Sequence, residues 1–536
     1  MELFIVFLNH KADGFYAKES NKMLNRQFDV VVVGAGPCGA LMAQRLSVHG
    51  AKVLVLEAGP RLDAHKDLQN AEANASRIMW NEPRAFVGSD FVAPKVGTGV
   101  GGGTLPWMGV MPRFDRSDFC TQTTEGVGED WPISYDDLRP YYQRIEEEMG
   151  VAGDCGPHAA ENYLLPMPAH QMNWHAQVLA RGARALGAQP FAPPIAINSV
   201  ERDGRPACTY CGYCGSGCPT NAKATSANTY LAQAESLGAR VISQAFVQRL
   251  CTNEAGDRLN GVDYIDENLC AFHVKAKVVI LAANPMETAR LLLLSASNNG
   301  AEGLANSSGV VGRYFMSHPT WQVFGTFDEP INAFKGMQMG HVMVQDYYRP
   351  VPQQDYARGY ILLSYMMPPI TFGNLSGLTY GQEFKDQLYE YAHTAAWWAH
   401  AEGLPERNNV ITLDPDLRDA RGLPVTRVHY QWGDNDVRVA AAGRDKAAAM
   451  MSASGAKKVR HGLNYGAHAM GGCRMGRDRK TSVVSEFGQS HDVKNLFIVD
   501  SSVFVTGSGV NPTLTSLAIA ARAADFINQK KWQGAL

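Results

Sequence analysis

The sequence feature that most constrains the fold is the stretch "DVVVVGAGPCGALMAQRLSVHG", residues 29–50. Its first residues predict a buried strand, and Pro37–His49 predicts a helix. Between and within these elements, Gly34, Gly36 and Gly39 form the pattern G-x-G-x-x-G. Glycines at these places permit a tight turn and let the helix N-terminus approach a pyrophosphate. We therefore expect this turn to bind a dinucleotide.

A second strand, "KVLVL" at Lys52–Leu56, follows the helix and ends at Glu57, eighteen residues after Gly39. An acidic side chain at this distance binds the hydroxyl pair of a ribose. The complete strand–turn–helix–strand–acid unit predicts an α/β fold with a Rossmann-like sheet. The unit does not distinguish FAD from NAD.

Three further segments complete this picture. The glycine-rich stretch "KVGTGVGGGTLPWMGVMPRF" (95–114) contains Gly102 and Gly103, and such a backbone suits contact with a flat ring system. Two more strand-to-helix patterns occur far along the chain, at 277–295 and 495–527. We therefore expect the nucleotide domain to be built from separated segments, with the substrate-binding region inserted between them.

Composition excludes several classes of function. The chain has 536 residues, which is long for a single core, and a net charge of -3 with no basic block, so nucleic acid is not an expected partner. It contains no apolar run of the roughly 18 residues that span a membrane. The N-terminal stretch 1–26 is a poor signal peptide and is expected to be an extension.

These motifs, together with "HAMGGCRMG" (468–476), resemble those of the glucose–methanol–choline (GMC) family of FAD oxidoreductases. The stretches 130–151 and 312–319 ("GRYFMSHP") are similar to the large, catalytic subunits of bacterial FAD-dependent sugar dehydrogenases, such as the gluconate, fructose, sorbitol and glucose enzymes. The resemblance implies an FAD-binding domain built from discontinuous segments and an inserted α+β substrate domain with an antiparallel sheet.

The resemblance also implies domain boundaries. The FAD-binding domain is expected at 27–314, including a cysteine-rich loop at 208–219, and the substrate-binding domain at 315–462. Residues 463–536 are expected to return to the FAD domain with the catalytic pair. The segment "NNVITLDPDLRDARGLPVTRVHYQW" (408–432) predicts paired strands, which we assign to the sheet of the substrate domain.

By its motif positions, the family's catalytic pair corresponds to His468 and Asn511. Oxidation of an alcohol requires removal of the hydroxyl proton as hydride leaves for the flavin N5, and a histidine suits that role. Asn511 can donate a hydrogen bond to the substrate oxygen. His461 is interpreted as structural, and His318 either lines the site or forms a turn.

Further residues of the cofactor site follow from the resemblance. Val247, in an expected strand "ARVISQAFVQRL" (239–250), matches the residue whose backbone meets the adenine. Asp500 matches the acidic position near the ribityl–phosphate chain, and Asn511 and Pro512 flank the isoalloxazine ring.

Four cysteines lie on the loop "CTYCGYCGSGCP" (208–219) with the spacing C-x2-C-x2-C-x3-C-P, which is typical of iron–sulfur ligands. Disulfides and a structural zinc site are less consistent with this spacing. The resemblance implies a three-iron (3Fe-4S) cluster on Cys208, Cys214 and Cys218. A four-iron (4Fe-4S) cluster that also uses Cys211 is the alternative.

The expected function is that of an FAD-dependent dehydrogenase acting on an alcohol group of a sugar, sugar acid or polyol, with electrons leaving through the iron–sulfur cluster. By resemblance, its partners are a cytochrome and a small chaperone-like subunit, and its location is the periplasm, with the cytoplasm as the alternative. Two other functions stay open. One is an oxidase that uses O2 and in which the cysteine loop is structural, and the other is a nonenzymatic electron-transfer subunit.

Overall fold

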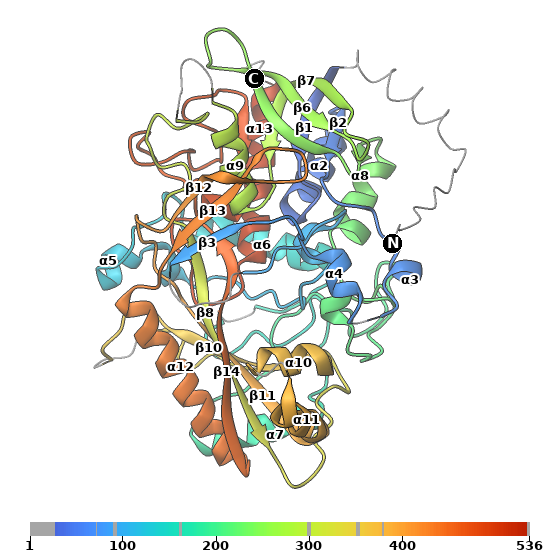
Figure 1. Ribbon diagram of the computed structural model, residues 1–536, viewed down its shortest axis with the longest axis vertical. Helices are drawn as coiled ribbons and strands as arrows, with labels where there is room; N and C mark the ends of the chain where they lie inside the picture. The colour runs from blue at the N-terminus through green and yellow to red at the C-terminus, as the bar shows by residue number, and fades with distance from the viewer. Residues whose placement is uncertain are drawn as a thin grey trace, which may run out of the picture.

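The computed structural model describes residues 27–532, except for residues 71, 89–93, 160–162, 297–301, 350–353 and 378–379. The expected N-terminal extension, 1–26, lies outside the described residues. Within the described part, no helix combines the length and hydrophobicity that a membrane span requires. Figure 1 shows two sheets at opposite ends of an elongated molecule, with a smaller sheet between them.

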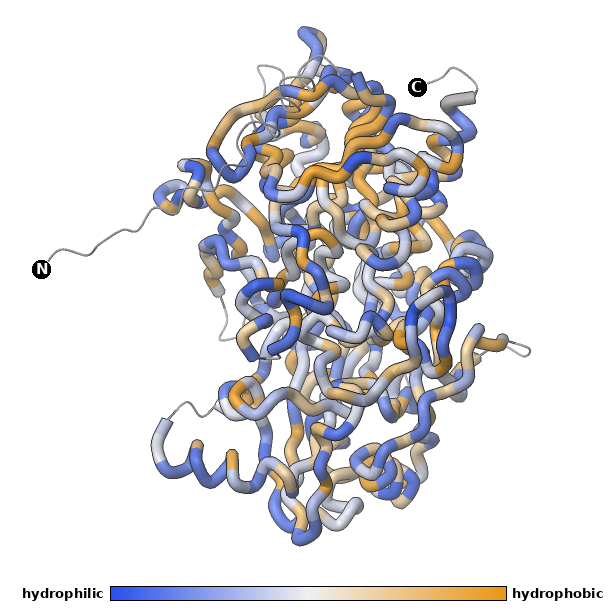
Figure 2. The backbone as a smooth tube through the Cα atoms, turned by 90° about the vertical axis from the view of Figure 1, so that its right-hand side faces the viewer, coloured by the Kyte–Doolittle hydropathy of each residue, from blue (hydrophilic) through white to orange (hydrophobic). Residues whose placement is uncertain are grey.

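The upper half of the molecule in Figure 1 contains a seven-stranded sheet in the order β4-β2-β1-β7-β6-β5, with β15 also paired to β7. Its strands are β1 (Gln27–Val33), β2 (Val53–Leu56), β4 (Arg240–Ile242), β5 (Phe246–Thr252), β6 (Leu259–Ile265), β7 (Ala271–Leu281) and β15 (Leu496–Ile498). The pairs joining β4, β2, β1, β7 and β15 are parallel, and β6 is antiparallel to both β5 and β7. Buried parallel strands are apolar along their whole length, and in Figure 2 the most hydrophobic stretches lie together in this half.

The sequence predicted one strand over 239–250, and this expectation is wrong. The structure has β4 and β5 instead, separated by residues 243–245. The backbone of Gln244 in this break has a φ of 54°, which an extended strand cannot accommodate.

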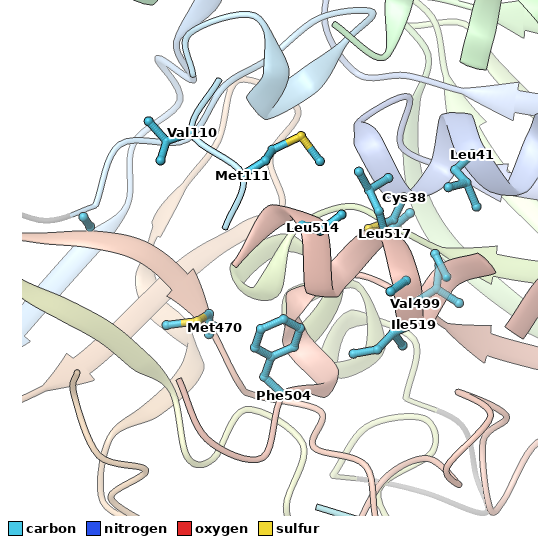
Figure 3. Close-up of a cluster of buried hydrophobic side chains, with 14 of the residues drawn as sticks. Cys38, Leu41, Val110, Met111, Met470, Val499, Phe504, Leu514, Leu517 and Ile519 are labelled. Carbon is cyan, nitrogen blue, oxygen red and sulfur yellow. The ribbon is translucent and has the colours of Figure 1, made fainter. Parts of the chain in front are cut away.

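The nucleotide half is assembled from separated segments of the chain. Strand β15 pairs with the C-terminal part of β7, on the side opposite to β1 from the N-terminal region. Helix α13 (Thr513–Trp532) packs against α2 (Pro37–Val48) and α6 (Tyr135–Met149). Figure 3 shows the resulting core, in which Cys38 and Leu41 of α2 lie near Leu514 and Leu517 of α13.

The lower half contains a five-stranded antiparallel sheet in the order β14-β8-β11-β10-β9. Its strands are β8 (Met316–Thr326), β9 (Met339–Val344), β10 (Tyr360–Tyr365), β11 (Thr394–Ala401) and β14 (Lys458–Met470). Helix α12 (Asp434–Ala453) packs on β8 and β11, and α7 (Trp174–Ala185) packs on α12. The mixed fold expected from the sequence, a Rossmann-like sheet plus an antiparallel sheet, is confirmed.

The hairpin expected at 408–432 is present as β12 (Val410–Arg418) and β13 (Pro424–Tyr430). It does not join the five-stranded sheet, so its assignment to that sheet is wrong. Strand β13 instead pairs in parallel with β3 (Ala85–Gly88), and the hairpin packs on α9 (Pro285–Leu294). Arg290 of α9 donates to the carbonyl of Pro424 at 2.8 Å and forms an ion pair with Asp419 at 2.7 Å, which fixes the hairpin to the nucleotide half.

The other helices lie between and around the sheets. They are α3 (Ala64–Asp67), α4 (Asn74–Ile78), α5 (Thr121–Glu125), α8 (Ala232–Ser236), α10 (Pro369–Leu375) and α11 (Gly381–Tyr389), a π-helical turn η4 (Ala227–Leu231), and the 3-10 turns η1 (Gly102–Thr104), η2 (Arg116–Phe119), η3 (Cys214–Ser216), η5 (Glu390–His393) and η6 (Ser501–Val503).

Candidate active site

A single cavity of about 480 Å³ extends from the carboxyl ends of the parallel strands to the face of the antiparallel sheet. The position agrees with the general rule that open α/β sheets bind ligands outside the carboxyl ends of their strands. The structure brings most of the residues expected for the cofactor and for catalysis to this cavity: Gly34, Gly36, Glu57, Gly102, Gly103, Val247, His468, Asp500, Asn511 and Pro512.

The glycines bring two loops and a helix into close contact at the nucleotide end. A Cβ on Gly102, whose φ is +51°, would lie 2.6 Å from the Cα of Gly36, so side chains are excluded where these loops meet. Gly39 does not line the cavity, and its Cβ would lie 2.0 Å from the carbonyl oxygen of Gly34. Only glycine therefore permits α2 to begin so close to the end of β1.

Glu57 connects three turns by hydrogen bonds at the cavity wall. Its carboxylate accepts hydrogen bonds from the backbone N–H groups of Ala35 at 2.8 Å, Gly59 at 2.9 Å and Gly99 at 3.2 Å. Burial raises the pKa of Glu57, and these three hydrogen bonds oppose that rise. The side chain expected to bind a ribose therefore also holds the glycine-rich loop against the β1–α2 turn.

Val247 and Asp500 lie on different walls of the nucleotide end. Val247 is the second residue of β5, next to Phe246, whose ring lies under the guanidinium of Arg421 at 4.2 Å. Asp500 accepts hydrogen bonds from the Thr288 hydroxyl at 2.6 Å and from the backbone N–H of Ser502 at 2.8 Å. Burial raises the pKa of Asp500.

The expected catalytic pair meets where the two halves of the molecule join. His468 lies near the end of β14, and Asn511 precedes α13, yet His468 Nε2 and Asn511 Nδ2 are 3.3 Å apart. His468 has a φ of 57°, a left-handed conformation that is uncommon for a residue other than glycine. Such strained backbone is concentrated at functional sites.

Two further histidines contact His468 from the antiparallel sheet. His318 Nδ1, on β8, and His400 Nε2, on β11, each lie 3.1 Å from His468 Nδ1. Burial lowers the pKa of His400 to about 4 and holds the pKa values of His318 and His468 well below the usual imidazole value. The sequence left the role of His318 open between site and turn, and no motif pointed to His400.

The substrate end of the cavity, beyond His468, has an apolar and aromatic wall. It is formed by β9, β10, β11, β14 and the segment around α10, through Met339, Tyr365, Met367, Pro368, Thr371, Leu375, Trp398 and Tyr465. The Trp398 ring lies 5.1 Å from that of Tyr365 and 5.7 Å from that of Tyr465. Among the described lining residues, the carboxylates, lysine and arginine lie at the nucleotide end: Glu57, Lys95, Glu287, Arg290 and Asp500.

The cysteine loop borders the same cavity. Cys214 and Cys218 are buried, Cys208 is half-buried and Cys211 is exposed; none of them forms a disulfide. Gly215 and Ser216, which lie between the two buried cysteines, line the cavity beside Trp107 and Met108. The sulfurs of Cys208 and Cys218 accept hydrogen bonds from the backbone N–H groups of Tyr210 at 3.4 Å and Lys223 at 3.3 Å.

Lys223 connects the cysteine loop to the glycine-rich loop. Its buried ammonium donates to the carbonyls of Leu105 at 2.7 Å, Trp107 at 2.9 Å and Cys214 at 2.6 Å. Burial lowers the pKa of Lys223 to about 8, while the Cys218 and Cys214 thiols oppose this change. Sequence reasoning missed this residue, because a single lysine outside any motif carries no signal of its burial.

Comparison with known proteins establishes the family. The models of the N-terminal and C-terminal parts of GMC oxidoreductases match residues 28–320 and 405–520. The chain belongs to the GMC oxidoreductase family. It is an FAD-dependent oxidoreductase that acts on CH–OH groups, as the sequence predicted.

Among its relatives, the chain is 32% identical to the fructose dehydrogenase large subunit of Gluconobacter japonicus, over 96% of this chain and 100% of the relative. It is 31% identical to the 2-methyl-1,2-propanediol dehydrogenase of Mycolicibacterium austroafricanum, over 94% of this chain and 96% of the relative. The fold is similar to that of the formate oxidase of Aspergillus oryzae, with a TM-score of 0.67 and 15% identity over 95% of this chain and 99% of that chain.

Proposed function

We propose that this GMC oxidoreductase is a dehydrogenase that oxidises an alcohol group of a neutral sugar or polyol and passes the electrons through an iron–sulfur cluster on the cysteine loop. The single observation that carries this proposal is the position of that loop. Gly215 and Ser216 line the cavity that also contains His468 and Asn511. The proposed electron exit would therefore border the cavity that contains the expected catalytic pair.

The residues of the nucleotide end fit FAD. Glycines line this part of the cavity, so the backbone forms the wall there and a ligand can approach it closely. When bound, FAD accepts the hydride that leaves the carbinol carbon of the substrate. In the proposed mechanism, His468 takes the hydroxyl proton at Nε2, and the Asn511 amide donates a hydrogen bond to the substrate oxygen. The lowered pKa of His468 keeps it unprotonated, and so able to act as a base, at neutral pH.

The choice of a neutral substrate rests on the substrate end of the cavity. The described residues there supply aromatic faces, a threonine hydroxyl and tyrosine hydroxyls but no arginine or lysine to pair with a carboxylate. Removing a carboxylate from water without such a partner is costly. The two relatives described above are named for a neutral sugar and a neutral diol, which supports the same class.

The cysteine loop fits an iron–sulfur cluster by the chemistry of its donors. Cys208, Cys214 and Cys218 are the proposed ligands of a 3Fe-4S cluster, with Cys211 as the additional ligand of a 4Fe-4S alternative. Backbone N–H groups aimed at two of the sulfurs and the buried Lys223 ammonium are suited to an anionic cluster. Such a cluster supplies one-electron transfer to an acceptor.

We further propose, from the resemblance to sugar dehydrogenases, a cytochrome acceptor, a small chaperone-like subunit and a periplasmic location. The name of the fructose dehydrogenase relative, a large subunit, is consistent with an assembly of this kind. Co-expression with candidate small subunits, followed by cell fractionation, tests these proposals. Exclusive recovery of active enzyme in the cytoplasm without a partner would contradict them.

The deciding experiment is anaerobic purification of the full chain, followed by visible spectroscopy, iron and acid-labile sulfide analysis, and low-temperature EPR. We expect flavin together with iron and sulfide, and loss of both inorganic components in Cys214→Ser. The matched control is Cys270→Ser, at an exposed position in the turn before β7. Flavin without iron or sulfide, in protein produced with sufficient iron, would overturn the cluster and leave either an oxidase that uses O2 or a dehydrogenase that passes electrons directly from the flavin.

The same measurement shows whether Cys211 is a ligand of the proposed cluster. A 3Fe-4S cluster predicts unchanged iron and EPR signals in Cys211→Ser, because this exposed cysteine is then not a ligand. A 4Fe-4S cluster predicts that this variant loses iron or changes its EPR signal.

A further inference from the structure

We propose that His318 and His400 are positioning residues that together fix the tautomer of His468, so that its Nε2 atom faces the substrate as an unprotonated base. This inference rests on the proposed function of His468. It assigns a role to two histidines that lie behind the catalytic pair and do not line the cavity.

The first step concerns the outer nitrogens of the two histidines. His318 Nε2 lies 2.7 Å from the carbonyl oxygen of Ser508, and His400 Nδ1 lies 3.0 Å from the carbonyl oxygen of Gly509. A carbonyl oxygen only accepts hydrogen bonds, so both outer nitrogens carry hydrogen. A neutral imidazole has one N–H group, and the inner nitrogens, His318 Nδ1 and His400 Nε2, are therefore bare acceptors.

The second step concerns what these acceptors face. Both lie 3.1 Å from His468 Nδ1. If His468 Nδ1 also carried no hydrogen, the lone pairs of three nitrogens would face one another in a buried site without a donor, which is unfavourable. His468 must therefore carry its hydrogen on Nδ1, and its Nε2 is left free to accept a proton. On the other side, Nε2 faces the Asn511 amide at 3.3 Å, which is a donor.

The neutrality of the two rings follows from their surroundings. His318 and His400 are 0% and 1% exposed, and burial lowers the pKa of both. Among the described titratable groups near the two rings, Glu402 and Tyr348 interact with Ser508, the Arg358 guanidinium pairs with Glu402 at 2.8 Å, and the Tyr430 hydroxyl donates to the Ser317 carbonyl at 3.1 Å. When His468 takes up the substrate proton, its Nδ1–H therefore donates to neutral rings, which stabilise the imidazolium without adding a second charge.

The carbonyls that set these tautomers belong to the same turn as the catalytic amide. Ser508 and Gly509 precede Asn511 by three and two residues, and Ser508 has a φ of 61°. The turn therefore positions the amide that binds the substrate oxygen and, through His318 and His400, orients the base. Proton removal and oxygen binding are aligned by one strained segment.

The test compares the kcat/KM of His318→Leu/His400→Leu with that of wild type across pH, using an alcohol substrate and a dye acceptor. Leucine removes both acceptors, so Nε2 can become the protonated nitrogen. We expect kcat/KM to fall by about 100-fold or more at neutral pH, as for loss of a general base. We also expect the neutral-pH plateau to become a continuous rise with pH, because hydroxide must then remove the proton.

His318→Leu/His400→Gln provides the conservative control, since it differs from the double leucine variant only at position 400, where the glutamine amide oxygen can replace the lost acceptor. We expect the kcat/KM of this control to be at least about 10-fold higher than that of the double leucine variant. We also expect its pH profile to show the neutral-pH plateau again. FAD content and melting temperature of each variant report whether the fold is intact. A double leucine variant that folds, binds FAD and keeps the wild-type pH profile overturns the proposal. If wild type itself oxidises no alcohol, the proposed function fails instead.

The three converging nitrogens are also spaced as ligands of a metal ion could be. Metal analysis of wild type and of the double leucine variant separates this case. Wild type with no metal other than the iron of the cysteine loop supports the hydrogen-bonded arrangement. A stoichiometric metal that is present in wild type and leaves with the two histidines, while cysteine-loop iron stays, overturns it.

Discussion

His468 Nε2 and Asn511 Nδ2 lie 3.3 Å apart, although one residue lies near the end of a strand of the antiparallel sheet and the other precedes the C-terminal helix of the nucleotide half. The expected base and the expected oxygen-binding amide are therefore set by the junction of the two halves. Any change that shifts one half against the other alters this distance. The geometry of the expected catalytic pair thus depends on the packing of the whole molecule.

Replacement of the expected base gives the most direct prediction. His468→Ala should lower kcat/KM for an alcohol by about 100- to 10,000-fold while FAD stays bound, because general-base catalysis contributes this much. The measurement is steady-state oxidation with a dye acceptor, together with the flavin spectrum. His461→Ala, an exposed site earlier on β14, is the matched control and should retain nearly full activity. Equal losses in the two variants would contradict the assignment.

The pH dependence of wild type follows from the lowered pKa of His468. Burial and the nearby His400 hold this pKa well below 6.5, so the unprotonated base dominates at and above neutral pH. We expect kcat/KM to be flat near neutrality and to fall on the acid side, with its midpoint below about pH 6.5. An acid limb centred above that value would show that a different group is titrating.

Glu57 should control cofactor retention. Glu57→Gln replaces one acceptor oxygen with an NH2 group that faces backbone N–H donors, and each buried group left without a partner costs about 1–3 kcal/mol. We expect weaker FAD binding and a lower melting temperature, measured by flavin release and thermal unfolding. Glu235→Gln, at the exposed partner of Arg61, should change neither.

The buried cluster around Arg358 makes a prediction about stability. Its guanidinium pairs with Asp118, Glu125 and Glu402, the last at 2.8 Å. Arg358→Met would leave these carboxylates without a cation, and the free energy of unfolding should fall by about 3–5 kcal/mol. Denaturant unfolding measures this change. Arg61→Met, which breaks an exposed pair with Glu235, should cost less than about 1 kcal/mol.

Substrate charge provides a further test. Because no arginine or lysine among the described residues lines the substrate end, we expect neutral polyols and ketoses to be oxidised with kcat/KM at least about 10-fold above that of gluconate. Initial rates with one dye acceptor across a matched panel of these compounds are the measurement. Preference for the acid would require a cationic group elsewhere at the site.

Local patterns explain how far the sequence could predict this structure. The β1–α2 turn and Glu57 were predictable because glycine spacing and an acidic residue at a fixed distance are tied to backbone geometry. The strand over 239–250 was wrongly predicted as continuous, because an apolar run does not reveal the left-handed residue Gln244. The hairpin at 408–432 was recognised, but its partner β3 lies more than 300 residues away, and periodicity carries no information about such pairing.

The candidate site also contains both residues that the sequence predicts and residues that it does not. His468 and Asn511 lie in recognisable motifs, whereas His400 and Lys223 stand alone in the sequence. Their importance arises only when β11 and β14 pair with the two sides of β8, and when the cysteine loop folds against Leu105 and Trp107. Isolated polar residues become informative through burial, which local sequence does not report.

The pairing of β15 beside β7, and of α13 against α2, also fixes an order of events during synthesis. The N-terminal strand and glycine turn leave the ribosome early, but residues 496–532 supply an essential wall of the nucleotide cavity. Until β15 and α13 are synthesised, the apolar surfaces of β7 and α2 that they cover stay exposed, and the chain must be kept from aggregating. We therefore expect the cofactor to enter an almost completed polypeptide, and a chain truncated before α13 to bind it poorly.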